Sequence, residues 1–364
     1  MAENKIKKIQ GLREYFSKHS LSEDFSSLIE REVGISLRAK YGNFSLKNPL
    51  MVAAGQLTRN LHQIVKIKKA GFGGCVLKSV VGEDERGNCS MRIQRKHPTY
   101  IVSVYDPEDR EKYFPIIHWD GGCDVRDLSS YLEFAQEASV YSDNNFLIVA
   151  SILCHLPPPE EGFRVREWFH TTKSLFELGY RILEIDFCPS LGREKGLLER
   201  ENVLRWYRTV PGLVKSVSKD ILVYPKLLNL EYGIEFQLEM VENALRGGAD
   251  GVVVANRIFR KELNTAHGGR ELRERNLIQI REIKKNFPQV PISATGGVYS
   301  GRHILEYLEA GADNVQILSF LMGKTSYPFL RSQGTRLEKV FHSLMLDSRE
   351  GLLTLLVKRG KSFL

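Results

Sequence analysis

Several apolar stretches of the chain end in, or are interrupted by, side chains that can bind ligands or transfer protons. They are Lys78, Ser79, Asp186, Cys188, Lys226 and Asn256. A lysine inside a stretch such as VYPKLL is unfavourable to bury without an anionic partner, unless it reaches solvent. Two lysines and an amide around one opening suit an electron-rich heteroaromatic cofactor that carries a phosphate.

Residues 290–319 contain a glycine turn that can bind such a phosphate. The stretch reads as a strand, the turn Gly296-Gly297, a helix that Ser300 can cap, and a second strand. A glycine turn that leads into a helix N-terminus leaves backbone N–H groups free to bind an anion. Gly268-Gly269 is a second turn of this kind. We expect the two turns to hold the phosphate together.

Alternating strand-like and helix-like segments position these residues. The predicted strands are 49–55, 74–80, 146–153, 182–187, 221–227, 251–256, 291–297 and 314–319. The predicted helices between them are 61–70, 127–141, 165–178, 201–217, 233–246, 272–286 and 302–310. Continuous apolar runs are typical of buried parallel strands. The pattern favours an α/β fold of the (β/α)8 TIM-barrel type over a doubly wound sheet, with the chemistry at the C-terminal ends of the strands.

The barrel is predicted to occupy residues 35–325 and to begin with a small hairpin at 35–45. Residues 1–34 form a helical extension of two short helices, the second capped by Ser22. This extension either packs on the barrel or a second subunit, or lies as a basic amphipathic pair on a membrane. Residues 326–364 form a C-terminal helical tail.

Composition narrows the classes of protein that fit. The five cysteines are widely spaced without a C-x-x-C pair, which argues against disulfides, a zinc site or an iron–sulfur cluster, and for the reducing cytoplasm. A net charge of +8 is compatible with an anionic ligand, nucleic acid or a membrane surface, but also with a lysine-rich solvated surface. The N-terminus lacks the apolar region of a secretory signal, and no apolar run is long enough for a transmembrane segment.

Taken in order, the motifs resemble those of the dihydroorotate dehydrogenase family of FMN-dependent barrels, over residues 35–325. The matching stretches are NPLMVAAG (48–55), LKSVVGEDERGNCSMR (77–92), EIDFCPS (184–190), VYPKL (223–227), VVVAN (252–256), the glycine pair 268–269 and ATGGVYSGRHILEYLEAGADNVQI (294–317). The resemblance implies FMN as the cofactor and transfer of hydride between flavin N5 and a C–C bond of a small substrate.

The resemblance also implies roles for particular residues. Cys188 takes the place of the family's active-site base, and Lys78 joins it as a catalytic residue. Substrate contacts are implied for Lys78, Asp186 and Asn256. FMN contacts are implied for Ala54, Gly55, Lys78, Ser79, Lys226, Asn256, Gly268, Gly269, Gly296, Gly297 and Ser319. Lys226 would stabilise negative charge on the reduced ring. No metal is implied.

Departures from the family pattern concentrate on the substrate side. The segment that helps to grip orotate is absent, and residues 97–122 stand in its place. Asp186 and Ser190 replace asparagines, and Leu318-Ser319 replaces Gly-Thr/Ser. We therefore expect an oxidoreductase of this type that acts on something other than dihydroorotate. Residues 97–122, with His118, Trp119 and Asp120, and the PPPEE loop are predicted to shape the new pocket.

Other functions remain open from the sequence. One is a true dihydroorotate dehydrogenase of pyrimidine biosynthesis with an unusual substrate loop. A tRNA dihydrouridine synthase-like enzyme would suit the basic charge, but the tail of about 40 residues is small for an RNA-binding domain, so no nucleic acid partner is expected. A non-catalytic FMN-binding protein is the third. The sequence leaves the electron partner open, and the resemblance allows a homodimer.

Overall fold

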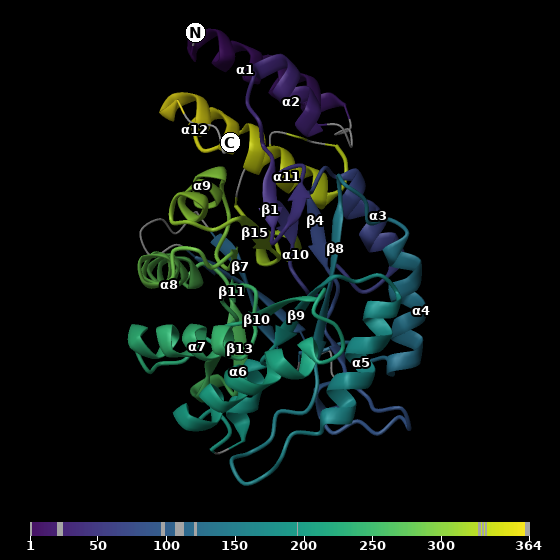
Figure 1. Ribbon diagram of the computed structural model, residues 1–364. Helices are drawn as coiled ribbons and strands as arrows, with labels where there is room; N and C mark the ends of the chain where they lie inside the picture. Colours follow the sequence, from purple (N-terminus) through teal and green to yellow (C-terminus); the bar gives the residue numbers. More distant parts are fainter. Residues whose placement is uncertain are drawn as a thin grey trace.

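Eight parallel strands form a closed barrel in the computed structural model, which describes residues 2–19, 25–95, 99–105, 113–119, 122–194, 196–326, 329, 331 and 333–360 (Figure 1). The strands are β3 (Leu50–Val52), β4 (Gly74–Val76), β8 (Leu147–Leu153), β9 (Ile182–Asp186), β10 (Leu222–Lys226), β11 (Val252–Val254), β14 (Ile292–Thr295) and β15 (Asn314–Ile317). Each pairs with its neighbours in chain order, and the β15–β3 pairing closes the ring. The predicted TIM barrel is confirmed.

The strands of this ring are buried on both faces, by the core inside the barrel and by the helices outside it. Almost every strand residue is buried, which explains the continuous apolar runs in the sequence. The predicted hairpin is formed by β1 (Ala39–Tyr41) and β2 (Phe44–Leu46). It inserts Tyr41, which is fully buried and packs edge-to-face on Tyr224 of β10 at 4.7 Å between ring centroids. The hairpin thus supplies one end of the inner core.

Helices cover the outside of the barrel, and each predicted one begins and ends within about two residues of its predicted bounds. They are α3 (Leu61–Lys69), α4 (Leu128–Ser139), α5 (Val165–Glu177), α6 (Arg200–Lys215), α7 (Ile234–Arg246), α8 (Leu272–Asn286), α9 (Gly301–Glu309) and the short α10 (Ser319–Met322). Side-chain caps fix two starts: Asn60 accepts from the Gln63 N–H, and Asp127 from the Ser130 N–H. Ser300 occupies the N-cap of α9 but makes no cap hydrogen bond there.

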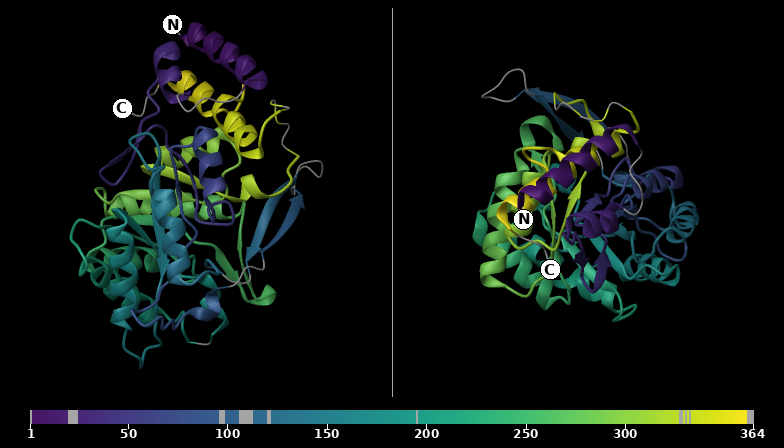
Figure 2. Two further views of the ribbon diagram at one scale, coloured as in Figure 1. Left: turned by 90° about the vertical axis from the view of Figure 1, so that its right-hand side faces the viewer. Right: turned by 90° about the horizontal axis from the view of Figure 1, so that it is seen from above.

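A four-stranded antiparallel sheet beside the barrel was not expected from the sequence. Its strands run in the order β12 (Ile258–Arg260), β13 (Thr265–Gly268), β7 (Tyr113–Trp119) and β6 (Thr99–Tyr105). The β6–β7 hairpin projects from the side of the molecule (Figure 2). Residues from the long loop after β4 therefore pair with residues that follow β11, and this pairing places both loops over one end of the barrel.

The two ends of the chain pack together. The predicted N-terminal helices are α1 (Ala2–Lys18) and α2 (Phe25–Val33), although Ser22 lies outside the described residues. The tail forms α11 (Arg336–Leu346) and α12 (Leu352–Arg359), which lie against α1 (Figure 1). Arg331 donates from Nη1 to the Phe16 carbonyl at 2.6 Å. No helix in the described ranges is both long and apolar enough to cross a membrane.

The tail also contacts the barrel at the start of α9. A Cβ on Gly301, the first residue of α9, would collide with the backbone of Leu344, Glu350 and Leu352. The C-terminal helices are therefore fitted closely to the helix that follows the glycine turn Gly296-Gly297.

Candidate active site

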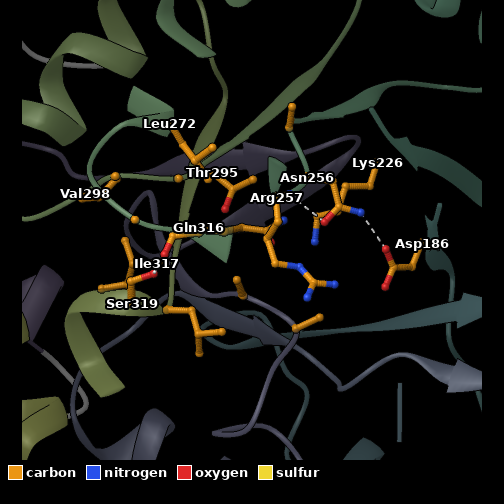
Figure 3. Close-up of a pocket in the computed structure, with 18 of the residues that line it drawn as sticks. Asp186, Lys226, Asn256, Arg257, Leu272, Thr295, Val298, Gln316, Ile317 and Ser319 are labelled. Carbon is orange, nitrogen blue, oxygen red and sulfur yellow. Dashed lines mark hydrogen bonds between the residues drawn. The ribbon is translucent and has the colours of Figure 1, made fainter. Parts of the chain in front are cut away.

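One cavity at the C-terminal ends of the barrel strands collects most of the predicted site residues (Figure 3). Those that line it are Ala54, Lys78, Ser79, Asp186, Lys226, Asn256, Gly268, Gly269, Gly296, Gly297 and Ser319. They come from loops and strand ends far apart in the sequence, and the barrel brings them together because all eight strands point the same way.

Gly55 and Cys188 are the two predicted residues that do not line the cavity. Gly55 packs under Leu318, where a Cβ would collide with the leucine side chain. Cys188 is fully buried, and its thiol donates to Oε1 of Gln94 at 3.5 Å. It lies directly behind the cavity wall, because a Cβ on the wall residue Gly122 would be 2.9 Å from Cys188 Sγ. Only a glycine at position 122 fits over this thiol.

Lys226 has the anionic partner that its buried position requires. Its Nζ lies 3.6 Å from Oε2 of Glu184, whose side chain is fully buried inside the barrel. The other oxygen, Oε1, accepts hydrogen bonds from the Tyr41 hydroxyl at 2.8 Å and from Gln316 Nε2 at 2.5 Å. The carboxylate is therefore held on both sides, and it fixes the ammonium group at the floor of the cavity.

Asp186, at the end of β9, lines the cavity. Its carboxylate accepts from Ser79 Oγ at 3.1 Å and from Asn256 Nδ2 at 2.8 Å. Asn256 Oδ1 in turn accepts from the Arg257 N–H at 2.9 Å. These bonds fix the amide orientation of Asn256 and place a carboxylate, a hydroxyl and an amide side by side on the wall.

Lys78 and Cys188 are two titratable groups that contact the wall residue Gly122. Burial lowers the pKa of Lys78 to about 8, although the neighbouring Cys123 opposes that shift. The ammonium donates to the Gly122 carbonyl. Burial raises the pKa of the Cys188 thiol, and Asp186 raises it further. Lys78 thus titrates near neutral pH, the range in which acid–base catalysts work best, whereas Cys188 is a thiol at pH 7.

The glycine turns form the opposite side of the cavity. Gly296 and Gly297 have φ of 97° and 65°, which favours glycine. A Cβ on Gly297 would lie 2.8 Å from the Arg270 carbonyl oxygen. The Tyr307 hydroxyl donates to the Gly296 carbonyl at 2.7 Å and keeps the turn in place. The turn leads into the N-terminus of α9, an arrangement that favours an anion.

This cavity fits FMN as its ligand. The glycine turns and the α9 N-terminus would hold the phosphate, and Lys226 would lie beside the isoalloxazine ring. Gln316 adds an observation of its own: its Oε1 is buried and accepts no hydrogen bond from any described residue, while its side chain lines the cavity. A bound ring system that carries N–H groups would satisfy such an acceptor.

The expected substrate-side residues lie elsewhere. His118 packs against His267 in the added sheet, at 5.9 Å between ring centroids. In the PPPEE loop, the Pro157 carbonyl accepts from Trp206 Nε1 at 2.8 Å, so that loop is fastened to α6. Neither His118 nor the PPPEE loop is among the described residues that line the cavity, whereas Gly122, from the predicted segment 97–122, is. Asp120 and the side chain of Trp119 lie outside the described part of the structure.

Among the lining residues that sequence reasoning did not name individually are Arg257, Gln316 and Gly122, the last of which belongs to the predicted segment 97–122. Gln316 carried a detectable signal, because it interrupts an apolar strand as Lys226 does. Arg257 carried none, since a charged residue after a strand is common on protein surfaces. Gly122 is brought to the site by the added sheet, which local sequence patterns did not reveal.

We expect Gly297→Ala to weaken FMN binding about tenfold or more, because a left-handed non-glycine residue is strained by about 1–3 kcal/mol and its Cβ would displace the Arg270 segment. Fluorescence titration of the flavin-free protein with FMN measures the effect. Gly87→Ala is the matched control, since Gly87 also has a positive φ of 78° but has no atom near the position of a Cβ. Equal FMN affinity in wild type and Gly297→Ala would contradict the assignment of this turn.

Comparisons with known proteins agree with this site. A family profile described as dihydroorotate dehydrogenase matches residues 230–330, which include both glycine turns. The catalytic subunit of dihydroorotate dehydrogenase B (NAD(+)) from Thermotoga petrophila is 27% identical over 288 residues, covering 76% of this chain and 92% of that protein. A dihydroorotate dehydrogenase A (fumarate) from Limosilactobacillus reuteri is 22% identical over 311 residues, covering 77% of this chain and 86% of that protein.

A shorter match has a somewhat higher sequence identity. Dihydroorotate dehydrogenase (quinone) from Dichelobacter nodosus is 32% identical over 145 residues, covering 37% of this chain and 39% of that protein. The three relatives differ in the electron acceptor that their names give, and all are similar to this chain at modest identity. These matches make the chain similar to the dihydroorotate dehydrogenases, at modest identity, and the barrel and its cavity are compatible with that similarity.

Proposed function

We propose that the protein is an FMN-dependent oxidoreductase that transfers hydride between flavin N5 and a C–C bond of a small substrate, with Cys188 as the acid or base. Enzymes of this family use FMN and act on CH–CH groups. The observation that carries the proposal is the single cavity in which Lys78, Asp186, Lys226 and Asn256 face the two glycine turns.

FMN, when bound, supplies the site that gives or takes the hydride. The chain's own residues bind, orient and move protons around it. Lys226, held by Glu184, places a fixed positive charge where negative charge develops on reduction. Asp186 and Asn256 hold each other in one orientation, so they present a fixed set of hydrogen-bond partners to the substrate. Lys78, with its lowered pKa, can give or take a proton near neutral pH.

Cys188 moves the proton that accompanies the hydride. In substrate oxidation its thiolate removes a proton from one carbon while hydride leaves the neighbouring carbon; in substrate reduction its thiol returns the proton. The raised pKa favours the thiol, so the donor form dominates at neutral pH. Sγ lies next to Gly122, which lines the cavity while Cys188 does not, so the proton has to pass that residue.

The visible spectrum of the purified protein tests the cofactor, and an anaerobic titration tests the substrate class. We expect absorption bands at about 370 and 450 nm, as for any oxidised flavin. A substrate that gives hydride to the flavin should bleach the longer-wavelength band. Dihydroorotate is the first compound to add, because the relatives are named for it. Bleaching would make the protein a true dihydroorotate dehydrogenase. A purified protein that binds no flavin, even after reconstitution with FMN, would overturn the proposed function.

A further inference from the structure

Buried polar side chains connect the β1–β2 hairpin to the floor of the cavity, through the inside of the barrel. The hairpin and the cavity lie at opposite ends of the strands. Gly42, in the turn of the hairpin, fits against Leu222 at the start of β10, whereas Lys226 is the last residue of that strand. Tyr41 is fully buried in an apolar cluster and is not among the described residues that line the cavity.

One line of contacts runs from Tyr41 to Lys226 through Glu184. The Tyr41 hydroxyl donates to Glu184 Oε1 at 2.8 Å, and Oε2 of the same carboxylate lies 3.6 Å from the Lys226 ammonium. Burial, and then the charge of Glu184, raise the pKa of the Tyr41 hydroxyl well above its usual value, so it remains a donor at neutral pH. Because the two carboxylate oxygens share one negative charge, a donor at Oε1 draws charge away from Oε2 and from Lys226.

A second line of hydrogen bonds fixes the amide of Gln316, which lines the cavity. The Lys40 carbonyl of the hairpin accepts from Asn314 Nδ2 at 2.8 Å, and Asn314 Oδ1 accepts from Ser293 Oγ at 2.6 Å. Gln316 Nε2 then donates both to Ser293 Oγ at 2.8 Å and to Glu184 Oε1 at 2.5 Å. A backbone carbonyl and a carboxylate can only accept, so every bond in this line has one possible direction. Gln316 already uses both of its N–H groups and cannot replace the Tyr41 hydroxyl.

The distribution of charge on Glu184 matters for the cavity because the barrel interior screens charge poorly. Reduction places negative charge on a flavin ring, and the Lys226 ammonium would stabilise that charge. A carboxylate whose charge is drawn toward Tyr41 opposes this stabilisation less than one whose charge faces Lys226. A hydroxyl at the closed end of the barrel can therefore change how easily a flavin at the open end is reduced.

We propose that Tyr41 is a positioning residue that raises the reduction potential of the bound flavin, acting through Glu184 and Lys226. The inference rests on the proposed function and deepens it, since it concerns the same cavity. Without the hydroxyl, the carboxylate attracts Lys226 more strongly and the flavin is harder to reduce. The β1–β2 hairpin thus has a redox role in addition to filling one end of the core.

The midpoint potential of the FMN-loaded protein tests this proposal. It is measured without oxygen, during slow reduction with xanthine and xanthine oxidase in the presence of a dye of known potential. Tyr41→Phe removes only the hydroxyl. We expect it to lower the equilibrium constant for two-electron reduction about 3- to 10-fold, a fall of about 15–30 mV. The FMN content should equal that of the wild type, because Tyr41 is not among the described residues that line the cavity.

Tyr180→Phe is the matched control. The Tyr180 hydroxyl is also buried, and it donates to the Ala135 carbonyl of α4 at 2.7 Å, away from the cavity. Its loss should leave the potential unchanged. Glu184→Gln supplies a second comparison, because no carboxylate then remains for Tyr41 to act on. Adding Tyr41→Phe to that variant should cause no further change in its potential.

The proposal is overturned if Tyr41→Phe keeps the wild-type potential or raises it, or if Tyr180→Phe causes the same fall. It is also overturned if Tyr41→Phe lowers the potential equally in the Glu184→Gln background. If Glu184→Gln is too unstable to retain FMN, the comparison of Tyr41→Phe with Tyr180→Phe decides alone. A protein that binds no FMN would instead defeat the proposed function, and the flavin spectrum recorded before reduction tells the two failures apart.

Discussion

Replacing Glu184 with glutamine should lower the free energy of unfolding by about 3–5 kcal/mol, the range found when one partner of a buried ion pair is removed. Glu184 is fully buried and lies 3.6 Å from the ammonium group of Lys226, which is itself almost fully buried. Glutamine keeps the shape of the side chain but leaves that ammonium without a counter-charge. Urea unfolding followed by far-ultraviolet circular dichroism gives the value.

The controls separate the buried pair from surface charge. Glu177→Gln removes one partner of the exposed pair with Lys173, and it should change stability by no more than about 0.5 kcal/mol. The double variant Glu184→Gln with Lys226→Met should recover much of the loss, because no unpaired charge remains. If Glu184→Gln were as stable as wild type, Glu184 would not be the counter-charge of Lys226.

Removing the thiol of Cys188 should slow the reduction of the flavin by its substrate about 10²- to 10⁴-fold, the range for loss of a general acid or base. Stopped-flow absorbance on Cys188→Ala, under anaerobic conditions, measures this step directly. The wild-type rate of substrate oxidation should rise with pH up to the raised thiol pKa, because the thiolate is the base. Cys188→Ala should lose that rise, and its pH dependence should follow only the titration of Lys78, whose pKa is about 8.

Cys89→Ala is the matched control, since Cys89 is a partly buried free thiol that does not line the cavity. It should leave the rate and its pH dependence unchanged. An unaltered rate in Cys188→Ala would exclude Cys188 as the acid or base and would point to Lys78, which lines the cavity directly. FMN content should remain equal in all three proteins, because neither cysteine lines the cavity.

The barrel could be predicted from the sequence because its strands are buried on both faces. Each therefore appears as a continuous apolar run, and the side chains that interrupt or end the runs are the ones that reach the cavity. Lys226 shows how far this reasoning extends. Its position required an anionic partner, but that partner, Glu184, comes from the adjacent strand β9. The register of the two strands, in which Lys226 is opposite Asp186, brings Glu184 close to Lys226, and the sequence alone does not give that register.

The added sheet could not be predicted in this way. Its central pairing, β7 with β13, joins residues more than a hundred positions apart, such as His118 with His267, and no local periodicity records such a partner. Gly122 and Cys188 are brought together by the loop that carries β6 and β7. The strand-end residues, which the barrel itself positions, were therefore the ones that the sequence could bring to one cavity, whereas the placement of His118 depended on the added sheet.

The contact between the two chain ends has a consequence for synthesis of the protein. Arg331 binds the carbonyl of Phe16, 315 residues earlier, and α1 rests on α11 and α12. A ribosome that adds about 5–20 residues per second needs roughly 15–60 s to pass from one to the other. During that time Ile9 and Phe16, buried in the finished protein, lack the C-terminal helices against which α1 packs. The first helix made is thus among the last to dock.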